Sequence, residues 1–137
     1  MTTRSDYAIQ KSLDHLYLNA AWSNIGNATG LPAAATAGNL YAALFVGASE
    51  AAYGGYVRIP IPRTGSGFSR TGNVITNVAQ INFVKSTADG GTATKVAIYD
   101  QVSGGNQLHL QTLASGIPTS TNVQPIIEAG ALTVTGS

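Results

Sequence analysis

The sequence predicts a mainly β protein: an antiparallel β-sandwich of jelly-roll type, preceded by a short N-terminal α-helix and a long loop or arm. Its 137 residues suffice for one domain with a sizeable core and are too few for two ordinary domains. One helical pattern stands at the start, and short strand-like segments fill the chain from residue 40 onward, a spacing typical of an antiparallel sandwich or barrel. We therefore expect a single structural unit, with the helix and extended arm in residues 1–39 and the β-sandwich in residues 40–137.

Apolar residues near the N-terminus predict one helix, over residues 6–18. Ile9, Leu13 and Leu16 follow one another at the spacing i, i+4 and i+7, which places them on one helical face. Ser5 is suited to cap the first turn. A helix of about three turns is too short to be stable alone, so its apolar face must dock on something. Its own domain is the first expectation, and a neighbouring copy or another protein is the alternative.

Residues 19–39 show no clear periodicity and predict an irregular arm. Glycine and proline interrupt this segment, which also contains a run of small residues at positions 33–37. An irregular loop of this length is uncommon inside a compact domain and is usually functional or mobile. We expect it to lie over a neighbouring protein, with Trp22 either as a local anchor or as an interface hot spot.

Strand-like patterns recur from residue 40 to the end of the chain. Residues 40–46 form a continuous apolar run, typical of a strand that is buried on both faces. Residues 56–61 alternate, but Pro60 has no amide hydrogen and restricts this strand to a sheet edge or a strand end. Turn signals stand at 89–91 and 103–106. Further strands are expected at 73–77, 80–83, 95–99, 107–111, 123–128 and 131–135.

Charged residues are rare in this chain. They make up 9% of the sequence, against roughly a quarter in a typical soluble domain, whereas hydrophobic residues make up 44%. Serine, threonine, asparagine, glutamine, glycine and alanine must therefore cover the surface. Removing water from amides and hydroxyls costs far less free energy than removing it from ions. Such a surface favours burial among neighbouring proteins.

The same composition excludes several classes of function. A net charge of +1 gives no general attraction to nucleic acid. The absence of cysteine excludes disulfides and thiolate metal sites. No signal-peptide core precedes the helix, and no stretch approaches the roughly 20 apolar residues of a membrane span. We therefore expect synthesis in the cytoplasm, with neither nucleic acid nor a membrane as a partner.

Candidate catalytic and metal-binding residues are few and scattered. The two histidines are His15 and His109, and neither belongs to an HxH or HExxH motif for zinc. The six acidic residues stand singly, so the sequence places no pair of carboxylates for acid–base catalysis. A glycine-rich segment begins like a dinucleotide fingerprint at Gly65, but Arg70 replaces its third glycine. We predict a non-enzymatic protein with no catalytic residue, no metal and no cofactor.

Three arginines form the main charge feature of the chain: Arg58, Arg63 and Arg70, all within thirteen residues. No acidic residue separates them, and aromatic side chains stand nearby at positions 53, 56 and 68. Arginine and aromatic residues are enriched at the centres of protein interfaces. This segment is either an ordinary solvated loop or an interface with an acidic or carbonyl-rich protein surface. Contact with glycan or nucleic acid is a further alternative.

Short segments spread over the whole chain form a recognisable pattern. They are SDYAIQKSLDHL at 5–16, LYAALF at 40–45, YVR at 56–58, INF at 81–83, STADGGT at 86–92, IYDQVSGGN at 98–106 and AGALT at 129–133. In this order they resemble a family of small tailed-phage virion proteins that are often labelled tail-fibre proteins. Two departures concern the surface that meets a partner: Gly90 stands where the family usually has tryptophan, and residues 19–38 are longer than expected.

The resemblance implies a structural component of a tailed-phage virion. A tail or neck fibre protein, a capsid decoration protein and an adaptor all fit it. A chain of this length has no room for the long shaft of a host-binding fibre, which favours a compact accessory protein on the virion surface. It would pack against capsid, neck or tail proteins and form a homo-oligomer, with a trimer favoured. The candidate interface residues are Tyr7, Leu13, Leu16, Trp22, Tyr53, Tyr56, Arg58, Arg63, Phe68 and Arg70.

A host-glycan-binding module of a tail fibre is the alternative function. Sandwiches of this size often bind glycans through exposed aromatic side chains beside polar groups. Trp22, Tyr53 and Tyr56 are the candidates for such stacking. The two functions differ in what the aromatic residues must do, because stacking on a sugar requires them at the surface.

Overall fold

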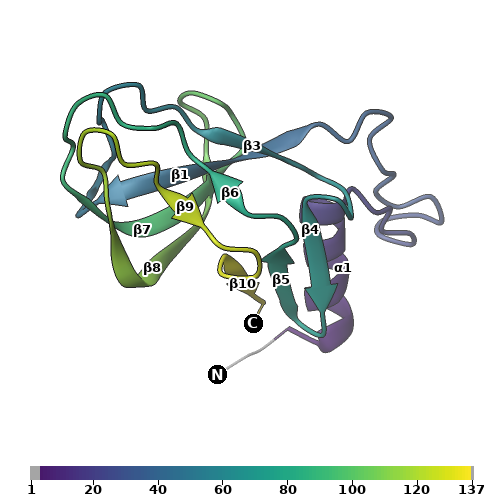
Figure 1. Ribbon diagram of the computed structural model, residues 1–137. Coiled ribbons are helices and arrows are strands. Elements are labelled where there is room, and N and C mark those ends of the chain that lie inside the picture. The colour runs from purple at the N-terminus through teal and green to yellow at the C-terminus, as the bar shows by residue number, and fades with distance from the viewer. Residues whose placement is uncertain (1–3, 137) are drawn as a thin grey trace.

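The computed structural model describes residues 4–136 and shows a mainly β protein with one N-terminal helix (Figure 1). The strands form three antiparallel sheets, and among the described residues no sheet closes on itself. The predicted class, mainly β and antiparallel after a short helix, is therefore confirmed. The three sheets and the helix share one large cluster of buried apolar side chains.

Helix α1 spans Asp6–Leu18, the range that the apolar spacing predicts. The Ser5 hydroxyl accepts a hydrogen bond from the Ala8 amide at 3.2 Å, which satisfies one of the free amides of the first turn. Ile9 and Leu13 are buried as predicted, but the third buried position is Tyr17, and Leu16 is half-buried. The Tyr17 and Phe68 rings pack edge to face, with 5.2 Å between their centroids. The helix thus docks on its own chain, the first of the two expectations.

The largest sheet has five strands in which β1, Asn39–Val46, is central. Strand β7, Thr92–Tyr99, pairs with one edge of β1, and β8, Gln107–Pro118, pairs with β7. The other edge of β1 pairs with two short strands in succession, β3 at Ile59–Pro62 and β2 at Ser49–Glu50. Within the described chain β3 pairs with β1 alone, which agrees with the edge position that Pro60 predicts.

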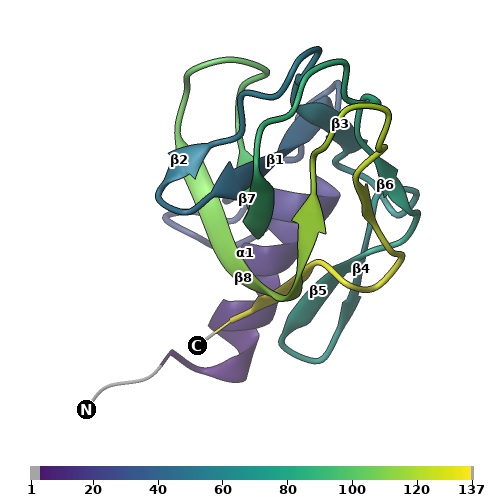
Figure 2. The same cartoon turned by 60° about the vertical axis from the view of Figure 1, so that its left-hand side comes forward.

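Strand β8 is longer than the predicted segment 107–111 because a large bulge joins two separate pairing regions. Thr112 pairs with Lys95 and Ile117 pairs with Ala93, so that residues 113–116 of β8 lie opposite Thr94. A bulge bends its strand, and β8 accordingly turns sharply in Figures 1 and 2. The bend carries the end of β8 towards the β9 segment.

Two smaller sheets complete the molecule. Strands β4, Phe68–Thr71, β5, Val74–Asn77, and β10, Thr133–Thr135, form one of them in the order β10-β5-β4. Strands β6, Ile81–Asn82, and β9, Ile126–Ile127, form the other. The predicted strand at 123–128 is thus reduced to two residues. The sequence patterns do not predict strands β2 and β4, because each strand is short and β4 lies between two glycines.

Residues 19–38, hereafter the arm, leave the body as an irregular loop at the right-hand end of Figure 1. Two rungs hold it. The Asn19 side chain donates to the Ala34 carbonyl at 3.0 Å and accepts from the Ala34 amide at 2.8 Å. Farther out, Trp22 and Leu31 exchange two backbone hydrogen bonds at 2.8 and 2.9 Å. The arm is irregular in the sense predicted, yet it has a defined structure of its own.

Candidate functional site

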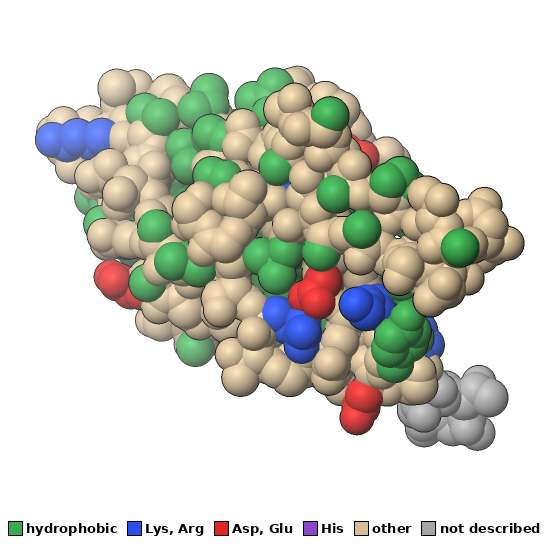
Figure 3. Space-filling view, turned by 90° about the vertical axis from the view of Figure 1, so that its right-hand side faces the viewer, with side chains coloured by type: hydrophobic (Ala, Val, Ile, Leu, Met, Phe, Trp, Pro, Cys, Tyr) green, Lys and Arg blue, Asp and Glu red, His purple; other side chains and the backbone are tan. Residues whose placement is uncertain are grey.

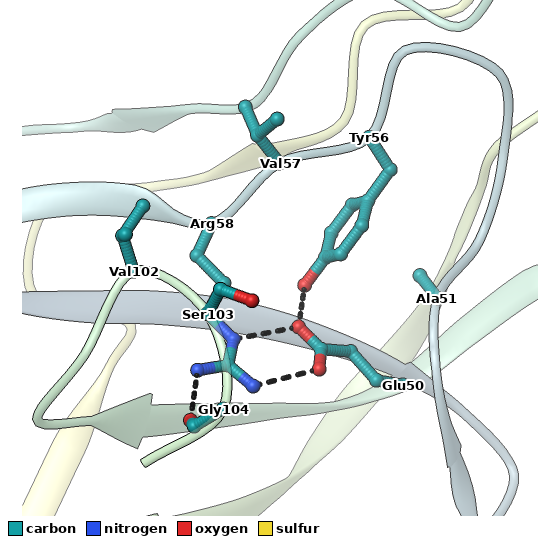
Figure 4. Close-up of a pocket in the computed structure, with 8 residues that line it drawn as sticks. All are labelled: Glu50, Ala51, Tyr56, Val57, Arg58, Val102, Ser103 and Gly104. Atoms are coloured by element: carbon teal, nitrogen blue, oxygen red, sulfur yellow. Dashed lines mark hydrogen bonds and ion pairs between the residues drawn. The ribbon is translucent and has the colours of Figure 1, made fainter.

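The segment that follows β2 brings Arg58 beside Glu50, and these two side chains form the most connected polar group of the molecule (Figure 4). Arg58 is 8% exposed. Its Nε and Nη2 donate to the two carboxylate oxygens of Glu50 at 2.8 and 2.9 Å, and its guanidinium stacks over the Tyr99 ring at 3.7 Å. Nη1 donates to the carbonyls of Gln101 and Gly104 at 2.9 and 2.8 Å. Every nitrogen of this guanidinium therefore has a partner inside the chain.

Tyr56 completes the group. Its hydroxyl donates to Glu50 Oε2 at 2.7 Å and accepts from the Leu44 amide at 3.1 Å. The hydrogen bonds from Arg58 lower the pKa of Glu50, against the opposing effect of burial. Burial, assisted by the Glu50 carboxylate, raises the pKa of the Tyr56 hydroxyl far above its usual value. Glu50 thus stays ionised and Tyr56 stays protonated at neutral pH, as a fixed charge and a fixed hydrogen-bond donor suited to structure.

A shallow hollow of about 400 Å³ lies over this group, with Glu50, Tyr56 and Arg58 at its base in Figure 4. Val57 and Val102 line it and are both well exposed to solvent, at 50% and 55%. The polar atoms at the base already bind one another. The hollow therefore offers apolar contact more than new hydrogen bonds.

Arg63 binds the end of helix α1 and the end of the arm. Its Nε and Nη2 donate to the carbonyls of Leu16 and His15 at 2.8 and 2.7 Å. These carbonyls belong to the last helical turn, which lacks intrahelical donors and carries partial negative charge. Nη1 donates to the Ala37 carbonyl at 3.1 Å. One arginine thus ties the helix and the arm to the segment that follows β3.

Arg70, on β4, forms an ion pair with Asp14 on helix α1. Its Nη1 also donates to the Gly72 carbonyl at 2.8 Å. Both side chains of the pair are about a fifth to a quarter exposed, so solvent weakens this contact more than that of Arg58 and Glu50. The three arginines therefore act as internal ties, rather than as a solvated loop or a free cationic patch.

The candidate interface residues divide into three groups by exposure. Leu13, Tyr53, Phe68 and Arg58 are buried within the chain. Leu16, Trp22, Tyr56, Arg63 and Arg70 are half-buried, and Tyr7 is exposed. The structure thus brings Tyr53, Tyr56 and Arg58 together, places Leu16 and Arg63 in contact at the helix end, and leaves Tyr7 and Trp22 apart from them.

Sequence reasoning missed Glu50 as the partner of Arg58. A signal was present, since Glu50 is the sole acidic residue between Asp14 and Asp89, and a buried arginine needs a counter-charge. It also missed the exposed apolar residues Ile25 and Leu31 of the arm. These side chains are isolated in sequence and become a surface feature through the fold of the arm.

His109, on β8, has an Nε2 atom that is buried and has no hydrogen-bond partner among the described residues. Burial lowers the pKa of this imidazole, and a backbone contact with Thr133 acts in the opposite direction. No group of three or more histidine, aspartate or glutamate side chains gathers in the described region to hold a metal ion. No helix in residues 4–136 is long and apolar enough to cross a membrane.

The surface carries few charged side chains. Figure 3 shows the end of the molecule with the arm and helix, where blue and red side chains are sparse among tan and green ones.

A comparison with curated proteins finds no match. A family model described as podophage GP4 fiber I protein gp80 matches residues 3–135, nearly the whole chain. The chain therefore belongs to this family: it is a phage fibre protein, a structural component of the virion and not an enzyme.

Proposed function

We propose that this fibre protein acts by packing against copies of itself, as a homo-oligomer with a trimer favoured, and against other virion proteins. One observation carries the proposal: the three clustered arginines are bound inside the chain, which leaves a surface with very little charge. A surface of small polar and apolar groups loses little hydration free energy when a protein covers it. Within the virion, the proposed place is an accessory position at the neck, tail or capsid.

The two parts of the chain have different roles in this packing. Residues 40–137 supply a rigid body, in which the five-stranded and three-stranded sheets act as the two layers of a sandwich. In support, Leu44 and Val96 from the larger sheet share one buried cluster with Ile75 and Val134 from the smaller. Residues 1–39 supply contacts to neighbours through their exposed side chains, among which Tyr7 is 57% exposed.

Packing of the aromatic residues weighs against the glycan alternative. Tyr53 is buried and its hydroxyl donates to the Val84 carbonyl at 2.5 Å, while Tyr56 uses its hydroxyl to bind Glu50 and Leu44. Of the three aromatics proposed for stacking on a sugar, Trp22 is partly exposed and its ring makes no stacking contact with another described ring. Protein–protein packing is the function that the exposed surface supports better.

The test is the mass of the purified protein in solution, by size-exclusion chromatography with light scattering over a range of concentrations. The proposal expects a discrete oligomer, with three copies favoured. It also expects virions that lack this protein to bind it again when it is added. A protein that stays monomeric and does not bind such particles would refute the proposal, and binding to host polysaccharide by calorimetry would favour the glycan alternative.

A further inference from the structure

Strand β8 forms an open edge of the five-stranded sheet. It pairs with β7 on one side, and within residues 4–136 no strand pairs with its other side (Figure 1). None of the residues of this strand is buried. An open edge presents unpaired amide and carbonyl groups, which bind another extended strand. The chemistry of this edge therefore specifies the kind of partner that fits it, a β-strand.

Proteins protect open strand edges against such pairing with proline, with charged side chains or by keeping the strand short. Here β3 has Pro60 and Pro62, β4 carries Arg70, and β2 has only two residues. Strand β8 has no proline, lysine, arginine, aspartate or glutamate over residues 107–117. Its large bulge, which also hinders pairing, begins only after Thr112. Among these four edges, the part of β8 before the bulge is thus the one left unprotected.

The pairing register shows which backbone groups of β8 are free. In an antiparallel sheet the amide and the carbonyl of a residue point to the same neighbouring strand, and successive residues alternate. Both groups of Leu44 on β1 bind partners on the side away from β7. Its pair on β7, Val96, therefore points to β8, where it meets Gln111. The residues on either side of Gln111, Leu110 and Thr112, then direct their amides and carbonyls to the open edge.

The Leu110 side chain ends an apolar row that crosses the outer face of the sheet. Ala43 on β1 pairs with Ala97 on β7, and Ala97 pairs with Leu110. The two alanines belong to a small buried cluster that is separate from the main one, whereas Leu110 is 41% exposed. The Gln111 side chain points the other way and binds the backbone near the start of β10. The row therefore stops at the open edge, with its last member in solvent.

A second copy of the chain offers both a strand for this edge and a continuation of this row. Resting on the proposed packing between copies, we propose that β8 of one copy pairs with β8 of another, antiparallel and about a two-fold axis at Leu110. The two Leu110 residues then exchange backbone hydrogen bonds, and their side chains lie side by side. The apolar row runs on from one sheet into the other, and β8 has no charged side chain to oppose its own copy.

A two-fold contact uses the same surface on both copies. It is distinct from the three-fold packing of the favoured trimer. Alone it gives dimers, and together with the three-fold packing it joins trimers in pairs. Either way it adds a contact of the rigid body to those proposed for residues 1–39, and it predicts an assembly with an even number of copies.

Cysteine trapping tests the position of the axis, since the natural chain has no cysteine. In the proposed pair the two Leu110 Cα atoms lie about 5.5 Å apart, a separation that a disulfide spans. Leu110→Cys protein should therefore form a covalent dimer under mild oxidation. Thr112→Cys is the matched control, because Thr112 is also exposed but its two copies would lie about 14 Å apart along the paired strands. Equal dimer yields from the two variants, or a higher yield from Thr112→Cys, would overturn the proposal.

Charge substitution gives an independent measurement. Leu110→Lys places two ammonium groups opposite each other on the axis and should weaken the two-fold association by about ten-fold or more, as measured by light scattering over a range of concentrations. Val102→Lys, at another exposed apolar residue, should leave this association unchanged. Thermal unfolding should show that both variants fold.

The outcomes separate this contact from the proposed function. A natural protein that is only trimeric, or Leu110→Lys protein that associates normally, would refute the β8 contact and leave the proposed function intact. A natural protein that is monomeric and does not bind virions that lack it would refute both.

Discussion

The guanidinium of Arg58 makes two parallel hydrogen bonds with the carboxylate of Glu50, at 2.8 and 2.9 Å. The same arginine holds the carbonyls of Gln101 and Gly104, which lie in the turn between β7 and β8. One side chain thereby joins the β1–β2 edge of the large sheet to the β7–β8 turn. Lysine cannot replace it, because an ammonium group lacks the planar fork that binds a carboxylate and two carbonyls at once.

Arg58→Lys should therefore destabilise the protein by about 2 kcal/mol or more, since several hydrogen bonds to a charged, buried group are lost. Urea unfolding followed by circular dichroism measures the change. Arg70→Lys is the matched control, as the same substitution in the more exposed ion pair with Asp14 should cost about 1 kcal/mol or less. Equal losses for the two variants would contradict the role assigned to Arg58.

Acidification should destabilise the fold through His109. Burial lowers the pKa of its imidazole in the folded state, so the unfolded chain takes up a proton first, at its usual pKa of about 6.5. Stability is then unaffected by this group above that pH and falls as the pH drops below it. The free energy of unfolding, measured at several values between about pH 7 and pH 5, should decline.

His109→Gln is the control for that decline, because glutamine keeps polar atoms at the site and does not titrate. The slope of stability against pH between neutrality and about pH 5.5 should be smaller in this variant. A variant with an unchanged slope would assign the decline to other groups.

Local patterns in the sequence predict the helix well. Its range of 6–18 follows from the apolar spacing and the Ser5 cap, both of which are set by neighbours along the chain. The spacing is less accurate about which side chain is buried, since Tyr17 and not Leu16 fills the space against Phe68. The broad β class and the edge position of Pro60 are also local properties. They follow from alternation and from a missing amide hydrogen.

Contacts between distant segments are where the sequence is less informative. The arginines at 58, 63 and 70 resemble an interface because no acid separates them, yet their partners are Glu50, Asp14 and backbone carbonyls that the fold brings from elsewhere. Carbonyl acceptors have no signature in the side-chain sequence. The bulge that extends β8 is equally hidden, because it depends on the register of two strands.

Gly90 has a tight environment that excludes a side chain. A Cβ at this position would lie 2.6 Å from the Tyr53 Cβ and 2.8 Å from its Cα. Gly90→Ala should therefore destabilise the fold by about 1–3 kcal/mol, the usual cost of overpacking, as measured by urea unfolding. The same contact excludes any larger side chain at position 90 of this backbone.

Gly65→Ala is the control for Gly90→Ala. A methyl group added at position 65 would have no atom within 4 Å, and the backbone there does not require glycine, so the change in stability should be within about 0.5 kcal/mol. Similar stabilities for the two alanine variants would mean that the space beside Tyr53 is larger than the structure indicates.

Asn19 combines two roles, and one substitution separates them. Its backbone has φ 52 at the end of helix α1, where glycine is also favoured, and its side chain forms the inner rung of the arm with Ala34. Asn19→Gly should keep the helix end and release the arm. Amide hydrogen exchange at Trp22 and Leu31 should then speed up, while global stability falls by only about 1 kcal/mol, because the lost bonds are solvent-exposed.

Asn24→Gly is the matched control, since Asn24 also has positive φ in the arm but makes no side-chain hydrogen bond with Ala34. If Asn19→Gly leaves exchange in the arm as slow as Asn24→Gly does, the order of the arm does not depend on this rung.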